Sequence, residues 1–240
     1  MTVLVTGFPA GAFAANCYLV APAPGEECVI IDPGQDAERG IEELLDRFKL
    51  KPIAVLLTHG HIDHMWSVVP VCGAKGVPAY VHPADRELLS DPGKGLSLMA
   101  KQHFGGFRGV APPGQHSMGG MTFSEPDDVK ALEDGEIVTL AGLDFRVGHA
   151  PGHTPGSVTF RSGAEDLDAL FTGDLLFAGS IGRTDLPGGD HQQILHSLAR
   201  TLTLPDETVV LPGHGPQTTI GAERQANPFL TGMKPAQKGL

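Results

Sequence analysis

The fold of this chain is decided by one stretch of sequence, Ile53-Ala54-Val55-Leu56-Leu57-Thr58-His59-Gly60-His61-Ile62-Asp63-His64. Its first five residues are apolar, which predicts a buried strand. Four metal-ligating side chains follow within six positions. Because successive side chains of an extended chain point to opposite faces, His59, His61 and Asp63 can converge on one side while His64 comes from the other. A strand that ends in this pattern predicts a metal site.

The overall composition is that of an ordinary globular protein. The chain has 240 residues, of which 41% are hydrophobic and 19% charged, and its formal net charge is −11. This acidic balance argues against a nucleic-acid partner, because phosphate binding depends on clustered lysine and arginine. No run approaches the roughly 18 apolar residues of a membrane span, and no signal-peptide pattern is visible. Three cysteines without a C-x-x-C pair do not indicate a disulfide framework. We therefore expect a cytoplasmic protein with no nucleic-acid or membrane partner.

Short apolar runs, separated by Gly, Pro and Asp, alternate with a few helical patterns. The runs form two groups, before about residue 83 and after about residue 136, and predict many short strands. Residues 36–49 and 190–202 carry apolar side chains at helical spacing, with Asp36 and Asp190 as the predicted N-caps. Shorter helices are expected from about His64 and over residues 84–90. Two strand groups accompanied by helices predict a layered α/β architecture.

We expect one domain over residues 1–240, with an inserted loop region at about 91–130. This region contains Gly-Gly and Pro-Pro pairs and no sustained periodicity. Loops of this length in compact domains are usually functional or disordered, and both alternatives stay open here. Four of its residues are candidates for the wall of a substrate pocket: His103, Phe104, Phe107 and His116.

Three further ligand candidates, His153, Asp174 and His214, also stand at the ends of predicted strands. A single structural zinc takes four ligands and usually includes thiolates. The set here comprises five histidines and two aspartates, with no suitably placed cysteine. Seven ligands exceed one tetrahedral shell, so two divalent ions are the economical interpretation, with Asp174 bridging them. These ligand types suit zinc, and also iron or manganese.

Two such ions, about 3.5–4 Å apart, share a water and lower its pKa from about 15.7 towards 7. The bridging hydroxide is then a nucleophile at neutral pH, and the same ions stabilise the oxyanion of an attacked carbonyl. No serine or cysteine stands in a nucleophile elbow, so we expect hydrolysis without a covalent intermediate. Asp63 and Asp174 are the predicted catalytic carboxylates, and Asp63 has the alternative role of orienting the bound water.

The order of the seven ligand candidates along the chain resembles that of the metallo-β-lactamase superfamily. The segments Gly152-His153-Thr154-Pro155-Gly156-Ser157 and Thr172-Gly173-Asp174 share this resemblance, which extends over nearly the whole chain. The resemblance implies an αββα sandwich of two mixed β-sheets flanked by helices, with the metals along one edge. It also implies that Asp174 lies between two ions, one held by His59, His61 and His153, the other by Asp63, His64 and His214.

Three further segments resemble the glyoxalase II-like (hydroxyacylglutathione hydrolase-like) enzymes: Gly182-Arg183-Thr184-Asp185, Pro212-Gly213-His214-Gly215-Pro216 and Glu223-Arg224-Gln225-Ala226-Asn227-Pro228-Phe229. Those enzymes hydrolyse thioesters, so the implied partner is a small-molecule thioester. Only 26 residues follow His214 (240 minus 214). In this short final segment the chain resembles the short branch of that family. Arg183 has two interpretations: it binds a substrate carboxylate, or it holds the metal loop through Asp185.

Other functions stay open. A persulfide dioxygenase shares the His-x-His-x-Asp-His and Gly-Arg-Thr-Asp motifs but uses one iron and oxygen. A lactonase or another ester hydrolase would use the same two-metal site. A purely metal-holding domain has little use for open coordination positions, and the position of His64 and the absence of an export signal argue against a β-lactamase.

Overall fold

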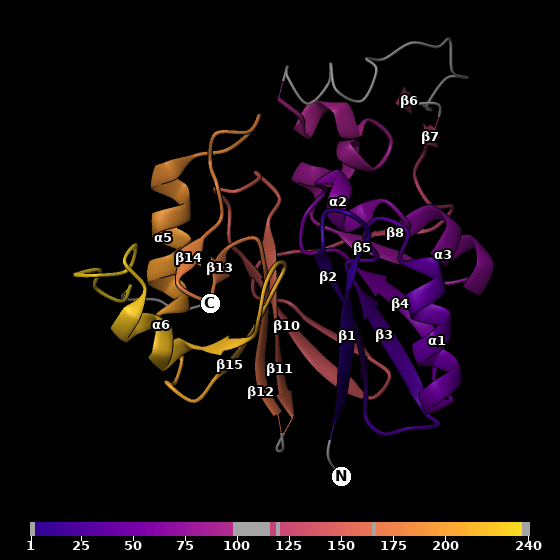
Figure 1. Cartoon of the computed structure of the whole chain (residues 1–240), viewed down its shortest axis with the longest axis horizontal. Coiled ribbons are helices and arrows are strands. Elements are labelled where there is room, and N and C mark those ends of the chain that lie inside the picture. Colours follow the sequence, from indigo (N-terminus) through magenta and orange to yellow (C-terminus); the bar gives the residue numbers. More distant parts are fainter. Residues whose placement is uncertain (1–2, 98–115, 119–120, 165–166, 237–240) are drawn as a thin grey trace.

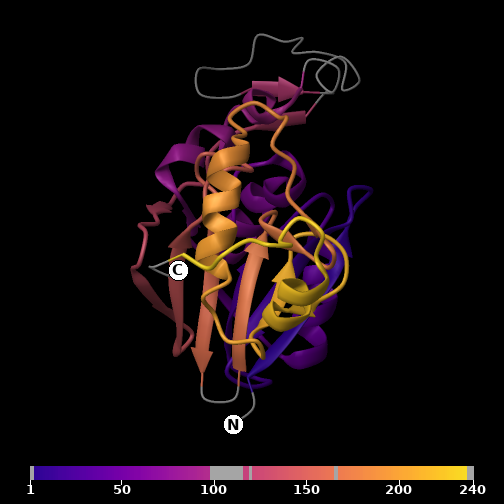
Figure 2. The ribbon, with the colours of Figure 1, turned by 90° about the vertical axis from the view of Figure 1, so that its left-hand side faces the viewer.

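The computed structural model describes residues 3–97, 116–118, 121–164 and 167–236. Figure 1 shows the ribbon and Figure 2 shows it turned by 90°. The elements, in chain order, are β1 (Leu4–Ala10), β2 (Ala15–Ala21), β3 (Glu27–Ile31), α1 (Glu38–Phe48), β4 (Lys51–Leu56), α2 (Ile62–Met65), α3 (Val68–Lys75), β5 (Ala79–Val81), the 3₁₀ helices η1 (Pro83–Leu89) and η2 (Pro92–Gly95), β6 (His116–Met118), β7 (Met121–Phe123), β8 (Val129–Ala131), β9 (Ile137–Leu140), β10 (Leu143–His149), β11 (Val158–Ala164), β12 (Leu167–Gly173), β13 (Leu176–Phe177), β14 (Ser180–Ile181), α5 (His191–Thr201), β15 (Val209–Pro212), β16 (Thr218–Thr219) and α6 (Ile220–Ala226).

The strands form two six-stranded mixed sheets. The first has the order β1-β2-β3-β4-β5-β8, and the second has the order β16-β15-β12-β11-β10-β9. In the first sheet, β1, β2 and β3 pair antiparallel, and β3, β4, β5 and β8 pair parallel. In the second sheet only the β12–β15 pair is parallel. The sheet order brings the carboxyl ends of β4, β12 and β15 to the edge where the ligand candidates lie.

The alternation of side chains along each strand explains how the layers pack. Val29 and Ile31 of β3 lie in the core between the sheets, together with Phe145, Phe160 and Phe171 of the second sheet. The intervening residues of β3 face the other way and pack against the helices. Strands that are apolar on both faces are typical of sheets covered on both sides.

Helices cover the outer face of each sheet (Figure 1). Ile41 and Leu45 of α1 and Val68 of α3 pack on the first sheet. Ile194 and Leu198 of α5 pack on the second sheet, together with Ile220 of α6. The αββα sandwich of two mixed β-sheets flanked by helices is therefore confirmed.

The structure corrects several local predictions. Asp36 is not the N-cap of α1: its φ is +52°, and Ala37 holds the cap position without a side-chain cap. Asp190 does cap α5, because its carboxylate accepts hydrogen bonds from the backbone N–H groups of Gln192 and Gln193. β8, at the end of the region predicted as an inserted loop, was missed although it completes the first sheet. Helix α6 was missed as well.

Among the described residues, no helix combines the length and apolar character that crossing a bilayer requires. The pocket-lining candidates His103, Phe104 and Phe107 lie outside the described residues, and His116 belongs to β6, in which no side chain is described.

Candidate metal centre

The predicted ligands come from the ends of four strands. His59 and His61 follow β4, Asp63 and His64 lie in α2, and His153 follows β10. Asp174 directly follows β12, and His214 follows β15. The structure brings all seven residues together in one cluster.

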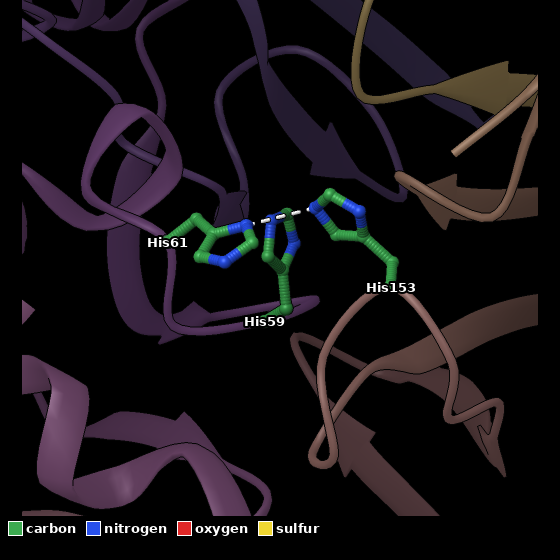
Figure 3. Close-up of side chains that lie close together, drawn as sticks. All are labelled: His59, His61 and His153. Atoms are coloured by element: carbon green, nitrogen blue, oxygen red, sulfur yellow. Dashed lines mark hydrogen bonds between the residues drawn. The ribbon is translucent and has the colours of Figure 1, made fainter. Parts of the chain in front are cut away.

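Three histidines form the first group of the cluster. The ligand atoms of His59, His61 and His153 lie within 4.8 Å of one another, and all three side chains are buried. Figure 3 shows their rings converging on a common point. His61 Nδ1 lies 2.8 Å from His153 Nε2 (dashed line in Figure 3). Three nitrogen atoms at this spacing match one face of a metal coordination shell.

Asp63, His64 and His214 form the second group within the same limit of 4.8 Å. His64 Nε2 lies 3.3 Å from His214 Nε2, and His214 Nε2 lies 3.3 Å from Asp63 Oδ2. Asp174 contacts both groups, since its Oδ1 is 3.3 Å from His64 Nε2 and its Oδ2 is 3.4 Å from His153 Nε2. Its Oδ2 also lies 3.7 Å from His214 Nε2, so the carboxylate of Asp174 lies between the two groups.

The hydrogen bonds of the cluster fit a bound cation. Asp32 holds His64 Nδ1 and the carbonyl of Arg183 holds His153 Nδ1, so the Nε2 lone pairs of both rings face the cluster. Those lone pairs meet other ring nitrogens at 2.8 and 3.3 Å, an arrangement that only a proton or a metal makes favourable. Among the described residues, His59 Nε2, His61 Nε2 and Asp174 Oδ1 are buried without a hydrogen-bond partner. Buried polar atoms left in this way are expected of metal ligands. A His/Asp metal-binding site is therefore present.

The charges of the cluster also favour cation binding. Burial and the surrounding imidazoles lower the pKa of His59 and lower that of His61 to about 3, so both rings are neutral ligands at pH 7. Burial alone raises the pKa of Asp174, but His64 outweighs this effect and the pKa lies below its ordinary value. For His64 the carboxylates of Asp174 and Asp63 outweigh burial and raise the pKa. A cation would take the place of the proton that His64 otherwise retains.

Asp32, which was not predicted, fixes two ligands at once. It is 2% exposed and accepts hydrogen bonds from the backbone N–H of Thr58 at 2.8 Å and from the Thr58 hydroxyl at 2.6 Å. Its Oδ2 also lies 3.0 Å from His64 Nδ1. Because the Thr58 hydroxyl donates to Asp32, it can accept from His59 Nδ1 at 3.1 Å. Such supporting carboxylates set the tautomer and orientation of metal-binding imidazoles.

Asp85 of η1, also not predicted, ties two ligand loops together. It is 0% exposed and accepts hydrogen bonds from the backbone N–H of Gly60 at 2.9 Å and of Gly156 at 2.7 Å. The Thr154 hydroxyl donates to it at 2.6 Å. Gly60 lies between two ligands of one loop, and Thr154 and Gly156 follow His153 in the other. The carboxylate of Asp85 thus fixes the loop that carries His59 and His61 relative to the loop that carries His153.

Arg183 supports the site in two ways. Its guanidinium makes a bidentate pair with Asp185, with distances of 2.7 and 2.6 Å. Its backbone carbonyl lies 2.8 Å from His153 Nδ1. The Arg183–Asp185 pair is exposed, and Arg183 also lines the cavity in front of the cluster. His149, which was not predicted as a ligand, lies outside the ligand groups and stacks on His82 with ring centroids 4.2 Å apart.

A cavity of 490 Å³ opens directly onto the cluster. His61, Asp63, His153, Asp174 and His214 form its polar floor, and Arg183 lies at its rim. Its apolar walls come from Phe13, Ile62, Leu96, Phe177, Ile181 and Leu186. A small organic molecule can therefore reach the cluster from solvent.

Curated relatives cover nearly the whole chain. An uncharacterized protein of Mycobacterium tuberculosis is 48% identical over 236 residues, which are 96% of this chain and 99% of that protein. The hydroxyacylglutathione hydrolase GloC of Haemophilus influenzae is 34% identical and covers 92% of this chain and 95% of its own length.

Solved structures agree with these relatives. The BLEG-1 B3 metallo-beta-lactamase is 38% identical with a TM-score of 0.78, covering 95% of this chain and 100% of its own. TTHA1623, crystallised in a di-iron-bound form, is 41% identical with a TM-score of 0.72, covering 92% and 97%. The sequence pattern of the metallo-beta-lactamase superfamily matches residues 10–214, from β1 to the last ligand candidate. The chain therefore belongs to the metallo-beta-lactamase superfamily.

Proposed function

We propose that this protein is a dinuclear metal-dependent hydrolase of thioesters, similar to the glyoxalase II-like enzymes. The observation that carries the proposal is the pairing of two ligand groups through Asp174, at the floor of an open cavity. A site for one structural ion needs neither a shared carboxylate nor access to solvent.

In this proposal His59, His61 and His153 hold one ion, Asp63, His64 and His214 hold the other, and Asp174 serves both. Two divalent ions bound there would lower the pKa of water and polarise a carbonyl oxygen. The side chain of Asp63 is 22% exposed at the cavity, where its carboxylate would accept a hydrogen bond from the attacking water. Asp32, Asp85 and the Arg183 carbonyl keep the ligands in place, so little reorganisation is needed during the reaction.

The thioester class is supported by the leaving group and by the relatives. A thiol has a pKa of about 8.5, so it departs as a thiolate without a strong acid beside it. The similarity to the hydroxyacylglutathione hydrolase of H. influenzae extends over 92% of this chain. The relative crystallised with two irons makes iron, beside zinc and manganese, a candidate for the metal.

The proposal is tested by turnover of a substrate panel by the metal-loaded protein, with thioesters, lactones and phosphodiesters assayed in parallel. We expect thioesters to be hydrolysed with the largest kcat/KM, and His59→Ala and Asp174→Ala to lose at least 100-fold of it, because each change removes a ligand. Arg146→Ala, on an exposed strand position, is the control. Full thioester turnover in metal-stripped protein would refute the proposal, and oxygen consumption with a persulfide would favour the dioxygenase alternative.

β-Lactam hydrolysis is a second candidate, because a B3 metallo-beta-lactamase is 38% identical over 95% of this chain. A β-lactam carbonyl would meet the same polar floor of the cavity. A chromogenic cephalosporin belongs in the panel for this reason, and a kcat/KM above that of every thioester would assign the protein to this activity instead.

A further inference from the structure

The segment between Asp174 and Arg183 leaves the metal centre and returns to it. After Asp174 the chain forms the hairpin of β13 and β14, in which Leu176 pairs with Ile181 and Phe177 with Ser180. It comes back at Gly182, where a Cβ would overlap the carbonyl oxygen of Asp174. The next residue, Arg183, offers its carbonyl to His153 at 2.8 Å. Both ends of the hairpin are therefore fixed to the ligands themselves.

The tip of the hairpin is fixed from the opposite side by α6 and the residue that follows it. Glu223 accepts hydrogen bonds from the backbone N–H of Gly179 at 2.8 Å and from the Thr218 hydroxyl at 2.7 Å. Asn227 donates from Nδ2 to the Ser180 carbonyl at 3.0 Å and to Glu223 at 2.8 Å. Glu223 is 5% exposed and Asn227 1%. Buried polar groups satisfied this completely hold a segment in one position.

The hairpin presents two apolar side chains to the cavity, Phe177 and Ile181. Both are half-buried, and the Phe177 ring meets the His214 ring edge-on with centroids 6.2 Å apart. Leu176, which pairs with Ile181 across the hairpin, is 0% exposed and anchors the hairpin in the core under α5. The hairpin thus places an aromatic face directly beside one ligand of the second group.

The charges around the cavity favour an uncharged ligand group on this face. Among the described residues that line the cavity, Arg183 is the one arginine or lysine, and its guanidinium is already paired with Asp185. A carboxylate on the part of the substrate that lies against Phe177 would therefore have no opposite charge on the hairpin.

We propose that the β13–β14 hairpin determines substrate specificity by binding an uncharged apolar group of the thioester against Phe177 and Ile181, with Glu223 and Asn227 as positioning residues. This inference rests on the proposed hydrolase function. Each additional methylene buried against the hairpin is expected to raise kcat/KM by about two- to fourfold, until the cavity is filled.

The first test is the chain-length dependence of kcat/KM for the metal-loaded full chain. One series varies the acyl group from acetyl to hexanoyl on N-acetylcysteamine, and the other varies an n-alkyl thiol on a constant acetyl group, so the two arms show which side of the thioester lies on the hairpin. We expect kcat/KM to rise along one series, and the rise to disappear in Phe177→Ser. Ile137→Ser, an equally drastic change on the exposed strand β9, should keep the wild-type dependence. A flat dependence in both series, or an unchanged one in Phe177→Ser, would overturn the inference.

The second test measures binding and does not depend on turnover. Calorimetric titration of the metal-loaded protein with n-alkyl carboxylates should show affinity rising from acetate to hexanoate in the wild type and not in Phe177→Ser, while succinate binds more weakly than butanoate. If no thioester is hydrolysed but this pattern appears, the proposed function fails and the role of the hairpin stands. If thioesters are hydrolysed but affinity is independent of chain length, the role of the hairpin fails alone.

The positioning role is tested with Glu223→Gln, which keeps the shape of the side chain but leaves one acceptor oxygen instead of two. We expect normal metal content and a reduced ratio of hexanoyl to acetyl kcat/KM, mainly through a higher KM for the longer substrate. Glu207→Gln, an exposed glutamate, is the control. A lower melting temperature with an unchanged hexanoyl-to-acetyl ratio would show that Glu223 only stabilises the fold, and would contradict its positioning role.

Discussion

Single residues beneath the ligands decide how the metal centre is shaped. Asp32 accepts three hydrogen bonds and reaches two histidines, one directly and one through Thr58. Gly213 also shapes the centre, because a side chain at this position would collide with Asp174 and His64. Neither residue is a ligand candidate, yet each determines where the ligand atoms lie.

Replacing Asp32 with asparagine should weaken metal binding by about 10- to 100-fold, the usual effect of losing a supporting carboxylate. An amide keeps the shape of the side chain but removes one acceptor and the negative charge beside His64. Asp36→Asn is a matched control, since Asp32 and Asp36 both have positive φ values, +50° and +52°, and Asp36 is exposed. Competition with a chelator measures the affinity, and equal affinities for the two variants would show that Asp32 has no such role.

Replacing Gly213 with alanine should reduce metal content and activity together. The added Cβ would overlap Asp174 Oδ1 and lie 2.7 Å from His64 Cε1, so one ligand must move. Gly73→Ala is the control: it adds the same methyl group where nothing lies within 4 Å, in a helix, where alanine stabilises by about 0.5–1 kcal/mol relative to glycine. Elemental analysis of both purified variants distinguishes them, and a full metal complement in Gly213→Ala would contradict the geometry.

At the scale of elements, the short helix η1 connects the two ligand loops, because Asp85 accepts from Gly60 of one loop and from Thr154 and Gly156 of the other. The residue before η1, His82, caps this helix by accepting from the backbone N–H of Ala84 at 3.2 Å. The relative position of the two ligand loops thus depends on this short 3₁₀ helix.

Asp85→Ala should lower the free energy of unfolding by about 3 kcal/mol or more, since it leaves several buried donors unsatisfied at about 1–3 kcal/mol each. Urea denaturation of the metal-free protein measures this loss without the contribution of metal binding. Glu87→Ala removes an exposed carboxylate from the same helix and should change the free energy by less than about 0.5 kcal/mol. Equal midpoints for the two variants would contradict the connecting role of Asp85.

The stack of His82 on His149 should make stability fall in mild acid. Burial and the neighbouring His149 lower the pKa of His82, although Asp85 and Asp134 act in the opposite direction. The unfolded chain therefore takes up a proton at a higher pH than the folded one, so this contribution to stability is complete above about pH 6.5 and is lost as the pH falls below it. His82→Asn retains a capping side chain without a titrating ring, and should show a smaller loss in urea midpoint between pH 7.5 and 5.5. The control His196→Asn, at an exposed position, should show the same loss in urea midpoint as the wild type. An equally large loss in His82→Asn would contradict this role of His82.

The sequence was sufficient for elements with a clear pattern and insufficient for those held by distant contacts. The ligands could be predicted because each stands at the end of an apolar strand, and Asp32, directly after Cys28–Ile31, carries the same signal. Asp85 carries none, since its partners are 25 to 71 residues away along the chain. β8 was missed because it has three residues, two of them exposed, and only its pairing with β5 makes it a strand.

At the scale of the whole molecule, two mixed sheets bring together residues from positions 59 to 214. The first sheet supplies one loop with four ligand candidates, and the second supplies three loops with one each. Asp174 lies between the two groups, so the sandwich must be complete before the centre exists. We therefore expect metal binding to be coupled to folding.

The number of metal ions bound per chain in fully active protein tests the dinuclear account most directly. Elemental analysis, performed during stepwise reloading of chelator-treated protein while thioester turnover is followed, should give two ions per chain, with full activity only when the second ion is bound. Full activity at one ion per chain, unchanged by a second, would contradict the account.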